Sequence, residues 1–523
     1  MKPWQIIIPM SGFGERFRRA GYTVPKPLID VLGKPVIGHV LDMFPGEKQV
    51  FFICNLEHLN EPAFALRETL SRLCPDGAVI GIMPHKLGPV YAVSKAFDAF
   101  DPTAPTIVNY CDFTCLWDWK EFQAYVKQTA CVGAVMGYTG FHPHMLGSTN
   151  YAYVRNDGDR VLSIQEKQPY TDNPMAEYAS SGTYYFSSGD IMRKAFEETV
   201  AREDLLVKGE YYVSLSYIPL LEQGADIRVF PVERFMQWGT PEDLEEFLYH
   251  AGLHCALRSA PENADPLPVS GTVVIPMAGM GSRFSVAGYA LPKPLIPVDG
   301  EPMSLRATRD LPALERQIFL VRADMPGLED IRALLVTAMP RCAIFVLPGP
   351  TEGQAITCLE AMKAVPPGSM VTIGACDNGY LYDQGALMRL LADENVDFII
   401  WGIRGFPGAA RRPNMYGWID ADENGEVRGV SVKKAFSDPR NDPIVTGAFI
   451  FKRKEDFVLS AERMIARSGR VNNEFYVDEC CNDALALGLK GKMFPVNAYI
   501  CWGTPEELRT YEYWRDVFAR WNA

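Results

Sequence analysis

Two stretches of the chain are nearly identical: IPMSGFGERFRRAGYTVPKPL at 8–28 and IPMAGMGSRFSVAGYALPKPL at 275–295. Each holds two glycines one residue apart, then an arginine, then a lysine between two prolines. The matched residues are Gly12, Gly14, Arg16 and Lys26 in the first stretch, and Gly279, Gly281, Arg283 and Lys293 in the second. Because every spacing is preserved, the pattern indicates an internal duplication.

Short β-branched and aromatic runs alternate with helical patterns after each of these stretches. In the first half the runs are QVFFICN, AVIGIMP and PTIVNYCDF, and in the second they are QIFLVRAD, CAIFVLPG and MVTIGACDN. Strands that alternate with helices are typical of a parallel sheet covered on both faces. The sequence therefore predicts two α/β domains, each a mainly parallel sheet flanked by helices.

The two halves stay aligned to their ends. Asp112 matches Asp377, Gly182 matches Gly447, and Trp238-Gly-Thr matches Trp502-Gly-Thr. The join is RSAPENADPLPVSG, a run rich in proline and polar residues that is typical of an exposed linker. We expect one domain at 1–257, a linker at 258–271 and a second domain at 272–523.

Composition and charge argue against several classes of protein. A formal net charge of −13 argues against a protein that binds nucleic acid or an anionic membrane surface. No apolar stretch reaches the roughly 18–20 residues of a membrane span, and the start is expected to be a first strand rather than a signal peptide. The 12 cysteines are scattered, without metal-site spacing. We expect a soluble protein with reduced thiols in the cytoplasm.

The glycine loop suits phosphate binding. Glycines after a strand expose backbone N–H groups, while arginine and lysine add charge for a polyphosphate. The dinucleotide pattern G-x-G-x-x-G fails in both copies, because Phe17 and Phe284 stand at the third position. A nicotinamide-dependent oxidoreductase is therefore disfavoured, and no Gly-Lys-Ser/Thr follows to make a P-loop.

The pattern GxGxRF…PKPL, an Asp after a later strand and a terminal WGTPEDL resemble the nucleotidyltransferases that activate sugar phosphates and related small molecules. That family includes thymidylyltransferases and the cytidylyltransferases of capsule pathways. The resemblance covers 6–244 and 273–508. It implies tandem Rossmann-like domains that transfer a nucleotidyl group from a nucleoside triphosphate to a sugar phosphate or another phosphorylated small molecule. Pyrophosphate would be released, Mg²⁺ would be the cofactor, and the product would serve surface polysaccharide synthesis.

The resemblance also implies roles for individual residues. Phosphate-binding and catalytic cations would be Arg16, Lys26, Arg283 and Lys293. Nucleotide contacts would come from Met10, Gly12, Gly14 and Gly88, and from Met277, Gly279, Gly281 and Gly353. The acceptor would meet Lys167, Gly182 and Glu210 in one half, and Lys434, Gly447 and Glu474 in the other. The metal would be held by Asp112 and Asp377.

Two departures from the family stand out. The family's second metal-binding Asp is replaced by Gln237 and Cys501. A glutamine carbonyl can bind Mg²⁺, whereas a thiol is a poor ligand for a hard cation. The residue before the acceptor lysine is Glu166 in one half and Lys433 in the other, so we expect different acceptors.

The implied reaction needs no general base, because a phosphate oxygen is already ionised near neutral pH. All 7 histidines lie in the first half, so histidine is not a shared base. Three alternatives remain open: both halves act on different acceptors, one half is active, or one half only senses nucleotide or acts as a scaffold. The base is also open, with CTP favoured because NYCDF and WGTPEDL look like capsule-type cytidylyltransferases.

Overall fold

A computed structural model describes residues 2–259, 269–312 and 314–521. Contacts divide the chain into two compact units, Met1–Leu248 (unit 1) and Tyr249–Ala523 (unit 2). The boundary falls inside helix α9 (Pro241–Ser259), earlier than the predicted 257. The reason is that Tyr249, near the middle of α9, donates a 2.7 Å hydrogen bond from its hydroxyl to the carbonyl of Tyr499 in unit 2. Most of the predicted linker, 260–268, lies outside the described residues.

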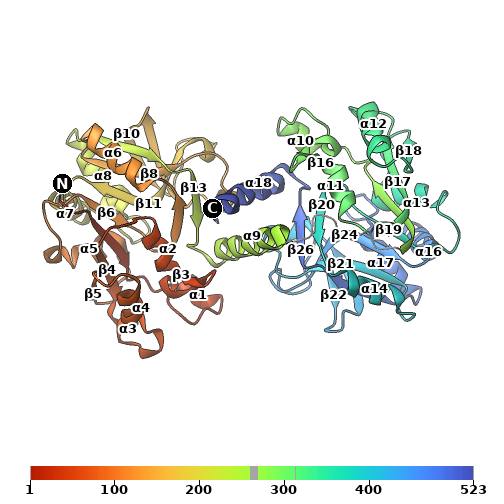
Figure 1. Cartoon of the computed structure of the whole chain (residues 1–523), viewed down its shortest axis with the longest axis horizontal. Coiled ribbons are helices and arrows are strands. Elements are labelled where there is room, and N and C mark those ends of the chain that lie inside the picture. Colours follow the sequence, from red (N-terminus) through yellow and green to blue (C-terminus); the bar gives the residue numbers. More distant parts are fainter. Residues whose placement is uncertain (1, 260–268, 313, 522–523) are drawn as a thin grey trace. The chain divides into compact units, whose positions relative to one another are not determined.

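Within the described residues, unit 1 is built on a nine-stranded sheet in the order β5-β4-β1-β6-β11-β8-β12-β10-β9 (Figure 1). Its strands are β1 (Gln5–Met10), β4 (Gln49–Asn55), β5 (Ala78–Ile82), β6 (Thr106–Asn109), β8 (Gly133–Tyr138), β9 (Ala152–Asp157), β10 (Arg160–Glu166), β11 (Tyr178–Phe186) and β12 (Ile227–Pro231).

The sheet of unit 1 is mixed, which corrects the prediction of a mainly parallel sheet. β4 and β6 run parallel to β1, as expected. β11, however, is antiparallel to both β6 and β8, and β9 and β10 form an antiparallel hairpin. The cause is the segment from β8 to β11, which contains short 3₁₀ turns instead of an α-helical crossover. Without a crossover helix, consecutive strands pair antiparallel.

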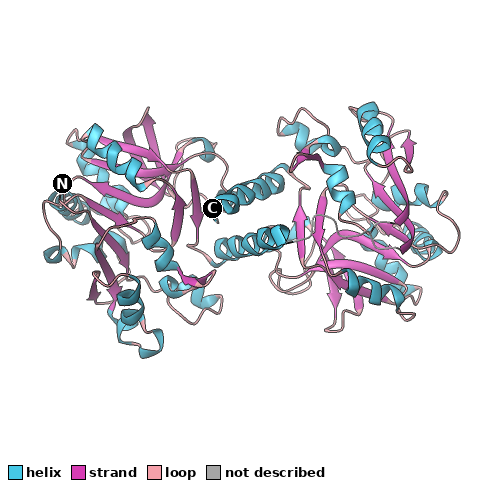
Figure 2. Cartoon of the chain, in the orientation of Figure 1, coloured by secondary structure: helices cyan, strands magenta, loops and turns pink. Residues whose placement is uncertain are grey.

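Helices cover both faces of this sheet (Figure 2). Ile6 and Ile8 of β1 face a core shared with helices α2, α4 and α6, while Ile7 faces one shared with α5, α7 and α8. Each face therefore takes alternate residues of a continuously apolar strand, as the two-residue strand period requires. The helices are α1 (Glu15–Arg19), α2 (Val36–Asp42), α3 (Leu56–Asn60), α4 (Leu66–Leu73), α5 (Gly88–Ser94), α6 (Trp119–Thr129), α7 (Gly189–Val200) and α8 (Tyr217–Glu222).

Unit 2 has the same strand order in its described part: β18-β17-β14-β19-β24-β21-β25, with β22 paired to β24 and β23 paired to β22. The strands are β14 (Val269–Pro276), β17 (Leu314–Arg322), β18 (Ala343–Leu347), β19 (Val371–Ile373), β21 (Phe398–Ile403), β22 (Gly417–Ala421), β23 (Val427–Val432), β24 (Ile444–Phe451) and β25 (Gly491–Pro495). This sheet is mixed too, since β24 is antiparallel to β19 and β21.

Two faces of the unit 2 sheet are again covered. One core includes side chains of helices α13, α16 and α17, and the other those of α12 and α14. The helices are α10 (Ser282–Val286), α11 (Met303–Arg309), α12 (Leu328–Ala338), α13 (Gln354–Met362), α14 (Gln384–Ala392), α15 (Pro407–Arg411), α16 (Lys454–Ala466), α17 (Val477–Ala486) and α18 (Pro505–Trp521).

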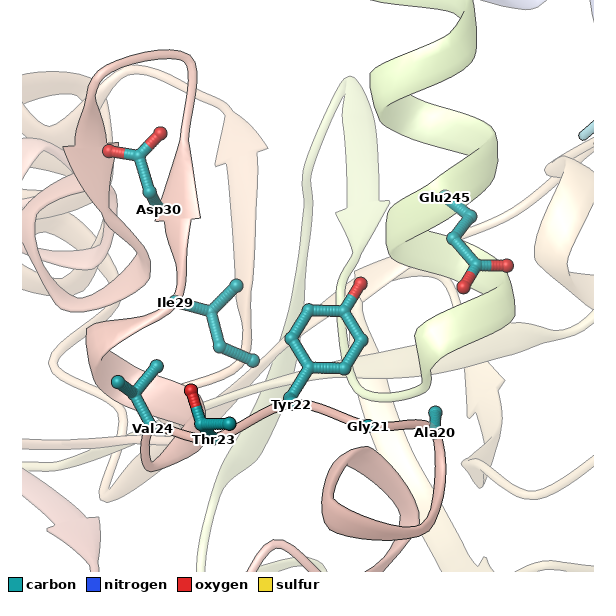
Figure 3. A pocket seen from close by; sticks show the side chains of 8 residues that line it. All are labelled: Ala20, Gly21, Tyr22, Thr23, Val24, Ile29, Asp30 and Glu245. Atoms are coloured by element: carbon teal, nitrogen blue, oxygen red, sulfur yellow. The ribbon is translucent and has the colours of Figure 1, made fainter.

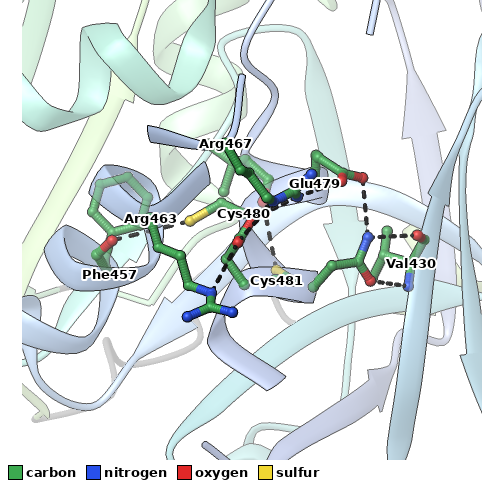
Figure 4. Close-up of polar contacts among 10 residues, drawn as sticks. Val430, Phe457, Arg463, Arg467, Glu479, Cys480 and Cys481 are labelled. Carbon is green, nitrogen blue, oxygen red and sulfur yellow. Dashed lines mark hydrogen bonds and ion pairs between the residues drawn. The ribbon is translucent and has the colours of Figure 1, made fainter. Parts of the chain in front are cut away.

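An ion-pair network fixes helix α17 in unit 2 (Figure 4). Asp483 is almost fully buried, and its carboxylate accepts hydrogen bonds from Arg467 at 2.6–3.0 Å. Arg463, on α16, lies 3.4 Å from the same carboxylate. A buried carboxylate is tolerated because these guanidinium groups satisfy it. The network ties α17 to the C-terminal part of α16.

Four short antiparallel ribbons complete the two units: β2–β3, β7–β13, β15–β16 and β20–β26 within the described residues. Their strands are β2 (Asp30–Val31), β3 (Lys34–Pro35), β7 (Phe113–Leu116), β13 (Arg234–Gln237), β15 (Pro297–Val298), β16 (Glu301–Pro302), β20 (Asn378–Leu381) and β26 (Ala498–Cys501). No helix in the described part of the chain is both long and apolar enough to span a bilayer.

Candidate functional site

The glycine loops follow the central strands β1 and β14. Gly14 has φ 63° and caps α1, and Gly281 has φ 62° and caps α10. This left-handed conformation disfavours other residues, which explains the second glycine of each motif. Beyond each loop, Arg16 and Arg283 are exposed on their short helices. Met10 ends β1, while Met277 directly follows β14.

The predicted lysine and aspartate meet in both units. Lys26 Nζ lies 2.7 Å from Asp112 Oδ2, and Lys293 Nζ lies 2.5 Å from Asp377 Oδ2. The side chains of Lys26 and Asp112 are 21% and 24% exposed, so the pair is reachable from solvent yet partly desolvated. Such a pair is worth more than a surface ion pair, because fewer water dipoles screen it.

Burial and charge act oppositely on these lysines. Burial alone would lower the pKa of Lys26, but the carboxylate of Asp112 outweighs it and the pKa is raised. The same balance, with Asp377 as partner, raises the pKa of Lys293. Both ammonium groups therefore stay charged at neutral pH.

The Trp-Gly-Thr loop joins each pair. The backbone N–H of Trp238 donates to the carbonyl of Asp112 at 3.0 Å, and Lys26 Nζ lies 3.5 Å from the carbonyl of Gly239. The ribbon β7–β13 brings these distant parts of the sequence together. In unit 2, through β20–β26, Trp502 N–H donates to Asp377 at 2.9 Å and Lys293 to Gly503 at 3.1 Å.

The Asp112 carboxylate and the Gln237 amide border one space at Gly239 in unit 1, with the amide nitrogen of Gln237 turned toward it. A Cβ added to Gly239 would lie 2.9 Å from the Gln237 amide nitrogen and 3.2 Å from Asp112 Oδ2, so the two side chains face one space. A carboxylate with an amide carbonyl, completed by water and phosphate oxygens, suits Mg²⁺. At the equivalent place in unit 2 the Cys501 thiol replaces the amide. Among the described residues, no group of three or more His, Cys, Asp or Glu is arranged to hold a metal.

The predicted acceptor lysine of unit 1 has a tyrosine partner that sequence analysis missed. Lys167 Nζ donates to the Tyr212 hydroxyl and sits 4.3 Å from its ring, and Tyr212 donates to Glu210. Burial is the largest influence on the pKa of Lys167, which is lowered; the charge of Arg16 is among those that add to the lowering.

In unit 2 the structural counterpart of Lys167 is Lys433, not the predicted Lys434. Lys167 and Lys433 share a rare left-handed backbone, with φ of 61° and 64°. Lys433 Nζ donates to the Tyr476 hydroxyl at 3.2 Å, and Tyr476 donates to Glu474 at 2.5 Å. Lys434 is exposed.

The prediction that the residue before the lysine is acidic in unit 1 and basic in unit 2 is therefore wrong. The residue before Lys433 is the uncharged Val432, whereas the residue before Lys167 is Glu166. Glu166 accepts a 2.6 Å hydrogen bond from Ser214, and burial raises its pKa to about 7. In unit 2 the carboxylate stands at the other of these two positions. Asp478 replaces Ser214, and burial raises the pKa of Asp478 to about 6. A Cβ on Gly417, paired with Val432, would meet Asp478 Oδ2 at 2.0 Å.

Gly88 and Gly353 lie directly against the segments that carry these acceptor residues. A Cβ on Gly88 would meet the backbone of Tyr211 at 2.8 Å, and one on Gly353 the backbone of Phe475 at 2.4 Å. Backbone hydrogen bonds join the two segments. One of them runs from the N–H of Tyr211 to the carbonyl of Leu87 at 2.9 Å. Both glycines have positive φ, so a side chain would clash and strain the backbone at once.

The predicted acceptor glycines lie in strands β11 and β24, again with positive φ: 99° at Gly182 and 91° at Gly447. A Cβ on Gly182 would touch the Phe113 and Tyr110 rings at 3.0 Å, and one on Gly447 would lie 2.8 Å from the Asn378 amide. Each glycine thus lets its strand pack closely against the segment that follows Asp112 in unit 1 or Asp377 in unit 2.

Unit 1 also contains a cavity of about 560 Å³ (Figure 3). It is lined by Ala20, Gly21, Tyr22, Thr23, Val24, Ile29, Asp30 and Glu245. None of the residues predicted to bind nucleotide, acceptor or metal lines it, so the site rests on the groups described above.

Comparisons with known proteins agree with the geometry of unit 1. Residues 5–208 match the family model "Nucleotidyl transferase". The chain is 33% identical over 107 residues to the bifunctional protein GlmU of Paraburkholderia xenovorans (strain LB400), covering 20% of this chain and 22% of that one. It is 23% identical over 233 residues to GlmU of Alkaliphilus metalliredigens (strain QYMF), covering 44% and 47%. The chain thus spans less than half the length of either relative.

Among solved structures, a nucleoside-diphosphate-sugar pyrophosphorylase from Vibrio cholerae RC9 aligns at 21% identity over 46% of this chain and 98% of that one, with a TM-score of 0.38. The family match lies entirely within unit 1. The N-terminal part of the chain is therefore a nucleotidyl transferase domain, and the predicted family is confirmed there.

Proposed function

We propose that both units are nucleotidyltransferases, in tandem, that transfer a nucleotidyl group from a nucleoside triphosphate to a sugar phosphate or another phosphorylated small molecule. The observation that carries the proposal is the ammonium–carboxylate pair seated on the Trp-Gly-Thr loop of both units. In this proposal CTP is the favoured donor, and the product feeds surface polysaccharide synthesis in the cytoplasm.

The chemistry assigned to the site is displacement at phosphorus. An acceptor phosphate oxygen attacks the α-phosphorus, the bond to the bridging oxygen of the β-phosphate breaks, and pyrophosphate leaves with that electron pair. Catalysis here consists of alignment and charge neutralisation. Lys26 sits beside the reacting phosphorus, Arg16 meets the triphosphate, and Lys167 with Tyr212 holds the acceptor phosphate; Lys293, Arg283 and Lys433 take these places in unit 2.

A divalent cation fits the oxygen donors of unit 1, as described above. Asp112 would hold it together with Gln237, whose amide would rotate to present its carbonyl oxygen in place of the nitrogen, and water and phosphate oxygens would complete the shell. When bound, Mg²⁺ supplies positive charge that stabilises the phosphate oxygens during displacement. Lys26, now paired with Asp112, would then turn toward the substrate phosphates.

A second candidate assigns catalysis to unit 1 alone, with unit 2 as a nucleotide-sensing or scaffolding domain. Cys501 favours it, since a thiol is a poor partner for a hard cation. The family match, which falls within unit 1, is consistent with it.

Pyrophosphate release tests the proposal. The full chain is assayed with each of four nucleoside triphosphates against a panel of phosphorylated acceptors. Asp112→Asn and Asp377→Asn are then compared, singly and together. We expect each single variant to lose turnover on one acceptor and the double variant to lose all of it. If only Asp112→Asn reduces turnover, unit 2 is not catalytic; if neither does, the proposal fails.

A further inference from the structure

We propose that Glu507 replaces the missing second metal ligand in unit 2, so that Asp377 and Glu507 together hold the divalent cation there. This inference rests on the proposed function of unit 2. It places the second carboxylate six residues after Cys501, on a helix, rather than on the strand position where the family has an aspartate.

The geometry around Gly503 carries the inference. A Cβ added to Gly503 would lie 3.2 Å from Glu507 Oε2, 3.4 Å from Asp377 Oδ2 and 3.5 Å from Cys501 Sγ. The missing side chain of Gly503 thus leaves a cradle bordered by two carboxylate oxygens. On the Asp377 side a cation is already present, since Lys293 Nζ bridges Asp377 Oδ2 and the carbonyl of Gly503 at 2.5 and 3.1 Å.

The sequence around Glu507 predicts another role, which the side chain does not take. Thr504-x-x-Glu507 before an apolar run is the pattern of a capping box, in which the glutamate accepts from the backbone N–H of the threonine. The threonine half forms, with Glu507 N–H donating to Thr504 Oγ1 at 3.2 Å. The carboxylate, however, accepts from the Tyr416 hydroxyl at 2.7 Å through Oε1, which leaves Oε2 facing Gly503.

Unit 1 has a different residue at the position of Glu507. Its matching residue, Asp243, is one methylene shorter and accepts from the Thr240 hydroxyl at 2.8 Å. There the Gln237 amide already faces the space above Gly239. Unit 1 therefore combines Gln237 on the strand with the shorter Asp243 on the helix. Unit 2 combines the Cys501 thiol on the strand with the longer Glu507 on the helix. Two carboxylates with water suit Mg²⁺ better than one carboxylate with a thiol.

Mn²⁺ binding to the full chain, followed by electron paramagnetic resonance, tests the inference without turnover. Asp112→Asn removes the unit 1 site and serves as the background. There, Glu507→Gln should weaken the remaining Mn²⁺ site at least tenfold, while the matched control Glu506→Gln, whose carboxylate pairs with Arg412, should leave it unchanged. Adding Cys501→Asp to Glu507→Gln should restore binding.

The outcomes separate the inference from the function on which it rests. If Asp377→Asn abolishes Mn²⁺ binding but Glu507→Gln does not change it, Glu507 is not a ligand and the proposed site survives. If Asp377→Asn also has no effect, unit 2 holds no cation at this place and its proposed function fails as well. Thermal unfolding of each variant identifies a loss that comes from misfolding, and rescue by Cys501→Asp would contradict such an explanation.

Discussion

The two units hold the same ammonium–carboxylate pair in different surroundings. Lys26 with Asp112 and Lys293 with Asp377 are nearly superimposable in distance and in their contact with the Trp-Gly-Thr loop. Around them an amide in unit 1 is exchanged for a thiol in unit 2. The two units therefore share the Trp-Gly-Thr loop and the lysine–aspartate ion pair. They differ in the neutral side chain beside the pair, which is Gln237 in unit 1 and Cys501 in unit 2.

The acceptor side shows the same behaviour. Each unit has one partly buried carboxylate there, but unit 1 supplies it from β10 as Glu166 and unit 2 from the start of α17 as Asp478. The opposite partners, Ser214 and Val432, are uncharged. A carboxyl group is therefore kept although its position along the chain moves, and its raised pKa is about 7 in unit 1 and about 6 in unit 2.

The largest expected effect comes from the lysines. Lys26→Met and Lys293→Met should each reduce pyrophosphate release on one acceptor about 10²–10³-fold, since each removes a charge aimed at the reacting phosphates. Lys34→Met is the control, because Lys34 pairs with Asp42 at the surface of unit 1. Equal losses in both lysine variants would establish two active units. A loss in Lys26→Met alone would mean that only unit 1 is catalytic.

The next effect is structural and tests the contact between the nucleotide and acceptor segments. Gly353→Ala and Gly88→Ala should each destabilise their unit by roughly 1–3 kcal/mol, because the Cβ meets backbone at positive φ. The loss should be larger for Gly353, where the approach is 2.4 Å against 2.8 Å. Urea unfolding measures it. Gly349→Ala, with no atom within 4 Å of its Cβ, should be neutral; if it destabilises as much as Gly353→Ala, the contact is not the cause.

Much of the site could be predicted because its motif is local. Two glycines, an arginine and a lysine within a few residues define the loop, and positive φ at Gly14 and Gly281 explains why glycine stands there. The boundary and the sheet direction could not be predicted in the same way. The segment between β8 and β11 lacks a helical crossover, and α9 continues into unit 2, which local alternation of strands and helices does not reveal.

The acceptor lysine of unit 2 shows the limit more sharply. Lys433 and Lys434 are adjacent and chemically identical in the sequence. Only the left-handed backbone at Lys433 and its hydrogen bond to Tyr476 distinguish them. The tyrosines Tyr212 and Tyr476 did carry a signal, since each stands two residues after the predicted glutamate in GEYY and NEFY.

The last expected effect is similar in size to that of the glycines but depends on pH, and it concerns Glu166. The folded-state pKa of Glu166, about 7, lies above its ordinary 4.5, so the folded unit binds this proton more tightly than the unfolded chain. The associated stability is fully present below about pH 4.5 and is lost as the pH rises through about 7. Glu166→Gln should therefore gain stability relative to the native chain, by roughly 1–3 kcal/mol, between pH 5 and pH 8.

In unit 2 the same reasoning places the window lower. Asp478 has a pKa of about 6 against an ordinary 3.8, so Asp478→Asn should show most of its relative gain by about pH 6. Urea unfolding of both variants at half-unit pH steps measures the two windows. If both variants gain stability over the same pH range, the two carboxylates do not differ in their surroundings. If Glu166→Gln shows no pH-dependent difference, Glu166 does not have a raised pKa. Windows separated by about one pH unit would instead mean that each unit holds its acceptor-side proton by a different side chain.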